Sequence, residues 1–93
     1  MNAEQQELFD LAILRVLDRN RTRFGLSVTA IGFQMREFGF AAVDVETLKD
    51  RLDYLSTHPA GKPFTEEVNP EINRAKRCWR ITDDGINHMD QRG

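Results

Sequence analysis

The sequence has little cysteine, no long apolar run and no excess of positive charge. Its one cysteine, Cys78, cannot close an intramolecular disulfide, and with two distant histidines (His58, His88) it cannot supply a four-ligand structural zinc site. This sparse use of cysteine fits a reducing cytoplasm. No stretch approaches the roughly 20 apolar residues of a membrane span. The polar N-terminus also lacks a basic segment followed by an apolar run, so we expect neither a membrane anchor nor a signal peptide.

Glycine and proline are also few, at 6 and 3 of 93 residues, while 40% of the positions are hydrophobic. This composition fits one globular domain over residues 1–93. The formal charge of -2 lacks the basic excess typical of nucleic-acid-binding domains. Basic side chains are nevertheless grouped in two segments without acids, residues 19–36 and 74–80. The grouping predicts one positive face, although an ordinary solvated surface would give the same pattern.

Residues 3–19 predict an amphipathic helix. Apolar side chains recur at helical spacing on one face: Phe9, Ala12, Ile13, Val16 and Leu17. Leu11 and Leu14 project from another side of this helix, so another part of the structure must cover them. The C-terminal helix or the second subunit of a homodimer could do so.

Two further helices are predicted in the middle of the chain. Ser27 or Thr29 is placed to cap the second helix, and Gly39 to end it in the left-handed conformation. The third helix is expected to begin after Asp44 and to end near Thr57, before Pro59. Its apolar stripe, which we expect to face the core, consists of Val45, Leu48, Leu52 and Leu55.

The hydrophobic period changes from helical to alternating after the third helix. Residues 64–68 and 78–81 predict the two strands of a hairpin, joined by a loop over residues 69–75. Thr82 then caps a short C-terminal helix whose first turn carries Asp83 and Asp84, where the helix dipole favours acids.

This order of elements resembles the winged helix-turn-helix superfamily of bacterial and archaeal regulators, which includes MarR-like and PadR-like proteins. The segment Trp79-Arg80-Ile81-Thr82-Asp83-Asp84-Gly85-Ile86 is similar to the aromatic-x-apolar-Thr-x-x-Gly run that closes the wing in those families. The resemblance implies an α+β fold with a three-helix core, a two-stranded β wing and a short C-terminal helix. It also implies binding of double-stranded DNA, with the third helix in the major groove and the wing at the backbone or minor groove.

The expected recognition helix is unusually acidic for that function. Its outward face carries Glu46, Asp50 and Asp53, which oppose contact with phosphates. We therefore expect the wing and the arginine-rich connector to make most of the DNA contacts. The candidate DNA-binding residues are Arg74, Lys76, Arg77 and Arg80 on the wing, Lys49 and Arg51 beside the third helix, and Arg21, Arg23 and Arg36 in and after the connector.

Two hypotheses remain open at this point. The chain is either a DNA-binding protein, such as a small transcriptional regulator or a mobile-element accessory factor, or a winged-helix module that binds a protein partner and not DNA. Phe33, which projects away from the apolar stripe of its helix, is with Leu11 and Leu14 a candidate for partner contact. No nucleophile has a base at a recognisable spacing, so we predict no enzymatic activity, no metal site and no cofactor.

Overall fold

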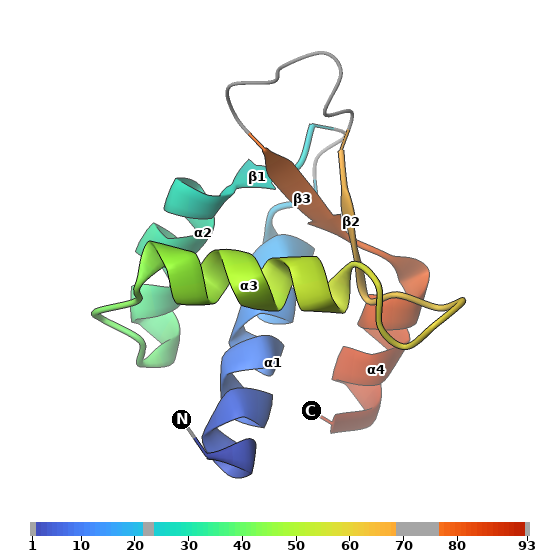
Figure 1. Cartoon of the computed structure of the whole chain (residues 1–93), viewed down its shortest axis with the longest axis horizontal. Helices are drawn as coiled ribbons and strands as arrows, with labels where there is room; N and C mark the ends of the chain where they lie inside the picture. Colours follow the sequence, from blue (N-terminus) through green and yellow to red (C-terminus); the bar gives the residue numbers. More distant parts are fainter. Residues whose placement is uncertain (1, 22–23, 69–76, 93) are drawn as a thin grey trace.

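A computed structural model describes residues 2–21, 24–68 and 77–92 of the chain. These residues form an α+β domain with four α-helices, a short 3-10 helix and a three-stranded antiparallel sheet (Figure 1). In chain order the elements are α1 (Ala3–Arg19), β1 (Leu26–Ser27), α2 (Val28–Gln34), η1 (Met35–Phe38), α3 (Val45–Leu55), β2 (Thr65–Glu67), β3 (Cys78–Ile81) and α4 (Asp83–Arg92). None of the described helices is long and apolar enough to cross a membrane.

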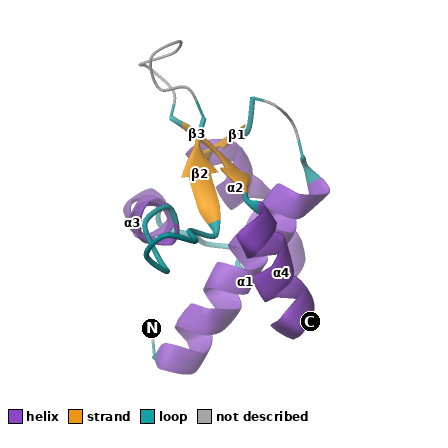
Figure 2. Ribbon diagram, turned by 90° about the vertical axis from the view of Figure 1, so that its right-hand side faces the viewer, coloured by secondary structure: helices purple, strands orange, loops and turns teal. Residues whose placement is uncertain are grey.

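Helix α1 has the predicted bounds and contributes the largest share of the core. Asn2 accepts a hydrogen bond from the backbone of Gln5, whose side chain accepts one from the backbone of Asn2, so a reciprocal capping box starts the helix. Leu11 and Leu14 are buried, with exposed fractions of 8% and 0%. Helix α4 lies beside α1 (Figures 1 and 2). The proposal that these two leucines contact a partner is therefore wrong, because the domain itself covers them.

The two central helices begin at the predicted caps. The side chain of Ser27 accepts from the backbone of Ala30, and that of Asp44 accepts from the backbone of Thr47. Gly39 ends η1 with a φ of 92°, the left-handed conformation that glycine adopts without strain. Leu48, Leu52 and Leu55 of α3 face the core as expected. Val45 does not: it lies in the first turn of α3, beyond the edge of the core, and is 51% exposed.

The sheet has the strand order β1-β3-β2, with both neighbouring pairs antiparallel. The hairpin of β2 and β3 was predicted, whereas β1 is an addition, formed where the connector pairs Leu26 with Trp79. Alternation along β3 places Trp79 and Ile81 in the core and Arg80 on the opposite, exposed face. Figure 2 shows that the sheet sits at one end of the domain, with α3 beside the hairpin.

Candidate functional site

Arg77 joins the hairpin to helix α3 through charged side chains. Arg77 donates through Nη2 to Asp53 Oδ1 of α3 and to Glu67 Oε1 of β2, each at 2.6 Å. Its guanidinium also lies over the ring of Trp79, 4.9 Å from the ring centroid. The hydrogen bonds that Arg77 donates to Glu67 and to Asp53, in that order of effect, raise the pKa of Arg77 above its ordinary value, despite partial desolvation. Arg77 therefore stays charged while it contacts both the helix and the hairpin.

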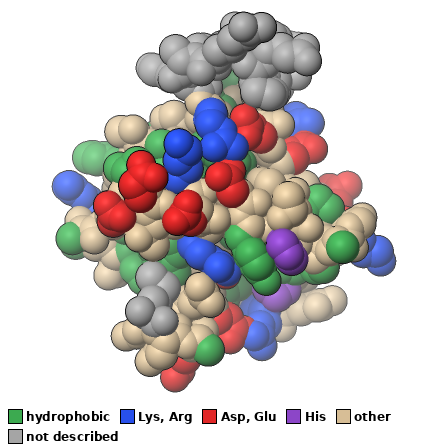
Figure 3. Space-filling model, in the orientation of Figure 1, with side chains coloured by type: hydrophobic (Ala, Val, Ile, Leu, Met, Phe, Trp, Pro, Cys, Tyr) green, Lys and Arg blue, Asp and Glu red, His purple; other side chains and the backbone are tan. Residues whose placement is uncertain are grey.

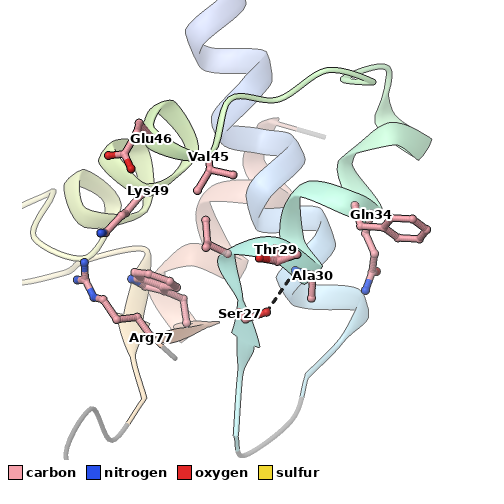
Figure 4. Close-up of a pocket in the computed structure, with 11 residues that line it drawn as sticks. Ser27, Thr29, Ala30, Gln34, Val45, Glu46, Lys49 and Arg77 are labelled. Atoms are coloured by element: carbon pink, nitrogen blue, oxygen red, sulfur yellow. Dashed lines mark hydrogen bonds between the residues drawn. The ribbon is translucent and has the colours of Figure 1, made fainter. Parts of the chain in front are cut away.

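A groove of about 790 Å³ lies between α2, the first half of α3 and the start of β3 (Figure 4). Lys49 and Arg77 stand on the same side of this groove, and Thr29 and Gln34 of α2 stand across from them. The lining also includes two strongly exposed apolar side chains, Phe33 at 68% and Val45 at 51%. The groove thus combines two cations and the acid Glu46 with accessible apolar surface.

Trp79 also lines the groove and is fully buried, yet its indole Nε1 has no hydrogen-bond acceptor among the described residues. A buried donor without an acceptor is costly, on the order of 1–3 kcal/mol. Sequence reasoning assigned Trp79 to the core, which is confirmed. No pattern in the sequence indicates that the indole N–H of Trp79 lacks an acceptor.

The structure does not bring all of the predicted basic residues to one face. Arg21 pairs with Asp18 and Arg80 pairs with Glu66, and both arginines line a shallow depression that also holds Asp83 and Asp84. Because β3 alternates, this depression and the Lys49–Arg77 side lie on opposite faces of the strand. Three candidates, Arg23, Arg74 and Lys76, lie outside the described residues.

Arg51, predicted to lie beside the DNA-binding face, is paired with a carboxylate of α1. Its Nε and Nη2 donate to the two carboxylate oxygens of Asp10 on α1, at 3.0 and 2.6 Å, and both side chains are less than one-fifth exposed. The hydrogen bond to Asp10 raises the pKa of Arg51. This bidentate pair joins α1 to α3, and Arg51 does not line the groove with Lys49 and Arg77.

The outward surface of α3 remains acidic. Glu46 and Asp50 are exposed, and neither makes an ion pair within the described part of the chain. Only Asp53 is neutralised, by Arg77. In Figure 3, Asp and Glu side chains gather along α3, and Lys and Arg side chains lie next to them toward the hairpin. The acidic outward face of α3 that the sequence predicts is therefore present, with Glu46 and Asp50 unpaired among the described residues and Asp53 paired with Arg77.

Arg36 of η1 and Phe33 of α2, which lines the groove, form an exposed pair. The Arg36 guanidinium lies 5.3 Å from the centroid of the Phe33 ring, consistent with a cation–π contact. Phe33 is strongly exposed, as predicted. Of the three residues expected to meet a partner, it alone has accessible surface for that role.

Within residues 2–21, 24–68 and 77–92, no group of three or more His, Cys, Asp or Glu side chains is arranged to hold a metal ion.

The two histidines, which are far apart in the sequence, line one cavity on another side of the domain. Their positions depend on packing between α3, α4 and the 56–64 loop, which no spacing in the sequence indicates.

The chain matches no protein-family model, no curated protein and no solved structure.

Proposed function

We propose that the chain is a winged helix-turn-helix domain that binds double-stranded DNA through the groove between α2, α3 and the hairpin. The observation that carries the proposal is the pair Lys49 and Arg77, two cations from different elements on one side of this groove. In a winged helix, the second and third helices and the wing form the surface that meets DNA. The strand order and the position of the hairpin beside α3 agree with that architecture.

The ion pairs on this surface do not prevent phosphate binding by the hairpin. Arg77 retains 37% side-chain exposure beside Asp53 and Glu67. Exposed ion pairs contribute about 0–1 kcal/mol each, so a phosphate can replace a carboxylate at little cost. The acids Glu46, which lines the groove, and Asp50 reduce affinity and favour contact through the hairpin over deep insertion of α3. Such a domain suits a small regulator or an accessory factor.

The test is fluorescence anisotropy with a labelled random-sequence duplex at low and moderate salt. The double variant Lys49→Ala/Arg77→Ala should weaken binding and reduce the slope of log affinity against log salt by about 2, one unit for each lost phosphate contact. The matched control is Arg15→Ala/Lys62→Ala, which also removes two positive charges. Arg15 and Lys62 do not line the groove and do not belong to the hairpin strands. Equal losses in both double variants, or no binding of the wild-type chain at low salt, would contradict the proposal.

A second candidate function is binding of a protein partner at the same groove. Phe33 and Val45 favour it, since two strongly exposed large apolar side chains flank a cavity next to uncompensated acids. The same titration separates the two functions. A protein-binding module would leave the duplex unbound at every salt concentration, whereas a DNA-binding domain would show affinity that falls steeply with salt.

A further inference from the structure

A second cavity, of about 480 Å³, opens between α1, α4, the C-terminal end of α3 and the loop that follows it. Its volume is in the range of sites for small organic ligands. Leu14 and Leu55 supply apolar lining. None of the residues that line this cavity lines the groove proposed to bind DNA.

Two stacked ring pairs line this cavity. His58 lies parallel to Tyr54 with centroids 4.1 Å apart, and His88 lies nearly parallel to Phe64 at 4.3 Å. Hydrogen-bond contacts of His58 Nδ1 with Tyr54 O at 3.1 Å and Thr57 Oγ1 at 2.8 Å fix the His58 ring. The chain has two histidines, and Figure 3 shows both beside hydrophobic side chains on one face. Flat rings held in this way favour a planar aromatic ligand.

The α1 side of the cavity is acidic. Glu7 and Asp10 are one helical turn apart and both line it. Each carboxylate already holds a planar cation of this chain: Asp10 holds Arg51, and Glu7 holds Arg92. The Arg51 guanidinium also lies 4.3 Å from the centroid of the Tyr54 ring. Next to the cavity, the Arg51 guanidinium thus has both a carboxylate partner and a ring partner, and the Arg92 guanidinium in the cavity lining has a carboxylate partner.

The two intramolecular pairs differ in how easily they can be replaced. Asp10 and Arg51 are less than one-fifth exposed and join two helices. Arg92 is half exposed and lies in the last turn of α4, and its partner Glu7 is 41% exposed. An exposed pair of this kind is weak, so a ligand cation can displace Arg92 from Glu7. Glu7 is thus the carboxylate that remains available to a ligand.

We propose that this cavity binds a small planar aromatic cation of the aryl amidine type, with its charged end on Glu7 and its ring against His58, His88 and Phe64. Arg92 occupies the cation position when no ligand is bound. An aromatic carboxylate of the same size is disfavoured, because it would have to compete with Glu7 for Arg92.

The test uses the full chain, benzamidine as the probe, and backbone and imidazole NMR shifts as the readout. Benzamidine should give saturable shifts at His58, His88 and the first half of α1, whereas benzoate and benzyl alcohol should give none there. Glu7→Gln should weaken benzamidine binding by about tenfold, the effect of losing one charge-assisted hydrogen bond. Arg92→Ala should strengthen binding several-fold, because it removes the competing cation.

Glu46→Gln is the matched control, since it makes the same change at the other cavity and should leave benzamidine affinity unchanged. The dispersion of the backbone amide chemical shifts in each spectrum shows whether the variant is folded. Absence of saturable shifts, equal binding of benzoate, or an unchanged affinity in both Glu7→Gln and Arg92→Ala would overturn the proposal.

Discussion

The backbone carbonyl of Phe64 packs so closely on Gly85 that a β-carbon at position 85 would lie 2.2 Å from the carbonyl oxygen. The same oxygen accepts a hydrogen bond from the backbone N–H of Thr82 at 3.1 Å. The Thr82 hydroxyl donates to Pro63 O at 2.6 Å and accepts from Gly85 N at 3.0 Å. The Thr-x-x-Gly segment thus attaches the first turn of α4 to the start of the hairpin.

Gly85→Ala should therefore be strongly destabilising, although alanine is the better helix former. The added methyl group meets backbone, which cannot move as a side chain can, so we expect a loss of at least about 2 kcal/mol in the free energy of unfolding. Gly32→Ala is the control: its β-carbon would meet only Leu48 Cδ2, at 3.4 Å, and its helix propensity improves by about 1 kcal/mol. Urea denaturation measures both. Equal stability of the two variants would contradict the close approach at Gly85.

The caps and the terminal motif were predictable because they are local. Ser27, Asp44 and Thr82 accept hydrogen bonds from residues three positions along the chain, so their roles are visible as short sequence patterns. The pairing of β1 in the sheet was not predicted, because its two residues pair with β3, which is distant in the sequence. Val45 fits the helical period of the apolar stripe, yet it is exposed, because the first turn of α3 projects beyond the core. The period of apolar residues does not indicate where a helix extends past the core.

The candidate site was less predictable, because charge pairing depends on tertiary structure. Arg51 appeared to flank the DNA-binding face, yet its partner Asp10 is 41 residues away on α1. Arg77 was identified as a basic wing residue, but its contacts with Asp53 and Glu67 required the hairpin to be placed against α3. A count of charges along the sequence therefore overestimated the number of arginines available to a ligand.

Arg51→Ala should reduce stability without a specific effect on DNA binding. The change leaves Asp10 partly buried without its cation, and we expect a loss of about 2 kcal/mol, less than for a fully buried pair. Arg15 is an exposed arginine of α1, and Arg15→Ala should change the free energy of unfolding by no more than about 0.5 kcal/mol. In the anisotropy assay both variants should bind the duplex equally. A markedly larger loss of DNA affinity in Arg51→Ala would restore Arg51 to the DNA-binding face.

Asp53→Asn should increase affinity for duplex DNA. The change removes one acid from the face of α3 and one of the two carboxylates that hold Arg77, so both effects favour phosphate contact. We expect a gain of about fivefold at low salt that shrinks as salt screens the charges. Asp90→Asn makes the same change on α4 and should have little effect. A weaker complex with Asp53→Asn would mean that Asp53 orients Arg77 for binding and does not compete with the phosphate.

Trp79 reports directly on the position of Arg77, because it is the only tryptophan of the chain. Its ring is fully buried, and the Arg77 guanidinium lies over it. Arg77→Ala should open the indole Nε1, which has no acceptor among the described residues, to water from the groove. Since water satisfies this donor, we expect emission at longer wavelength and stronger quenching by acrylamide, with little loss of stability. Arg80→Ala, on the opposite face of β3, should leave the emission unchanged. If both variants shift the emission alike, the change reflects general loosening of the hairpin and not the removal of a cover from Trp79.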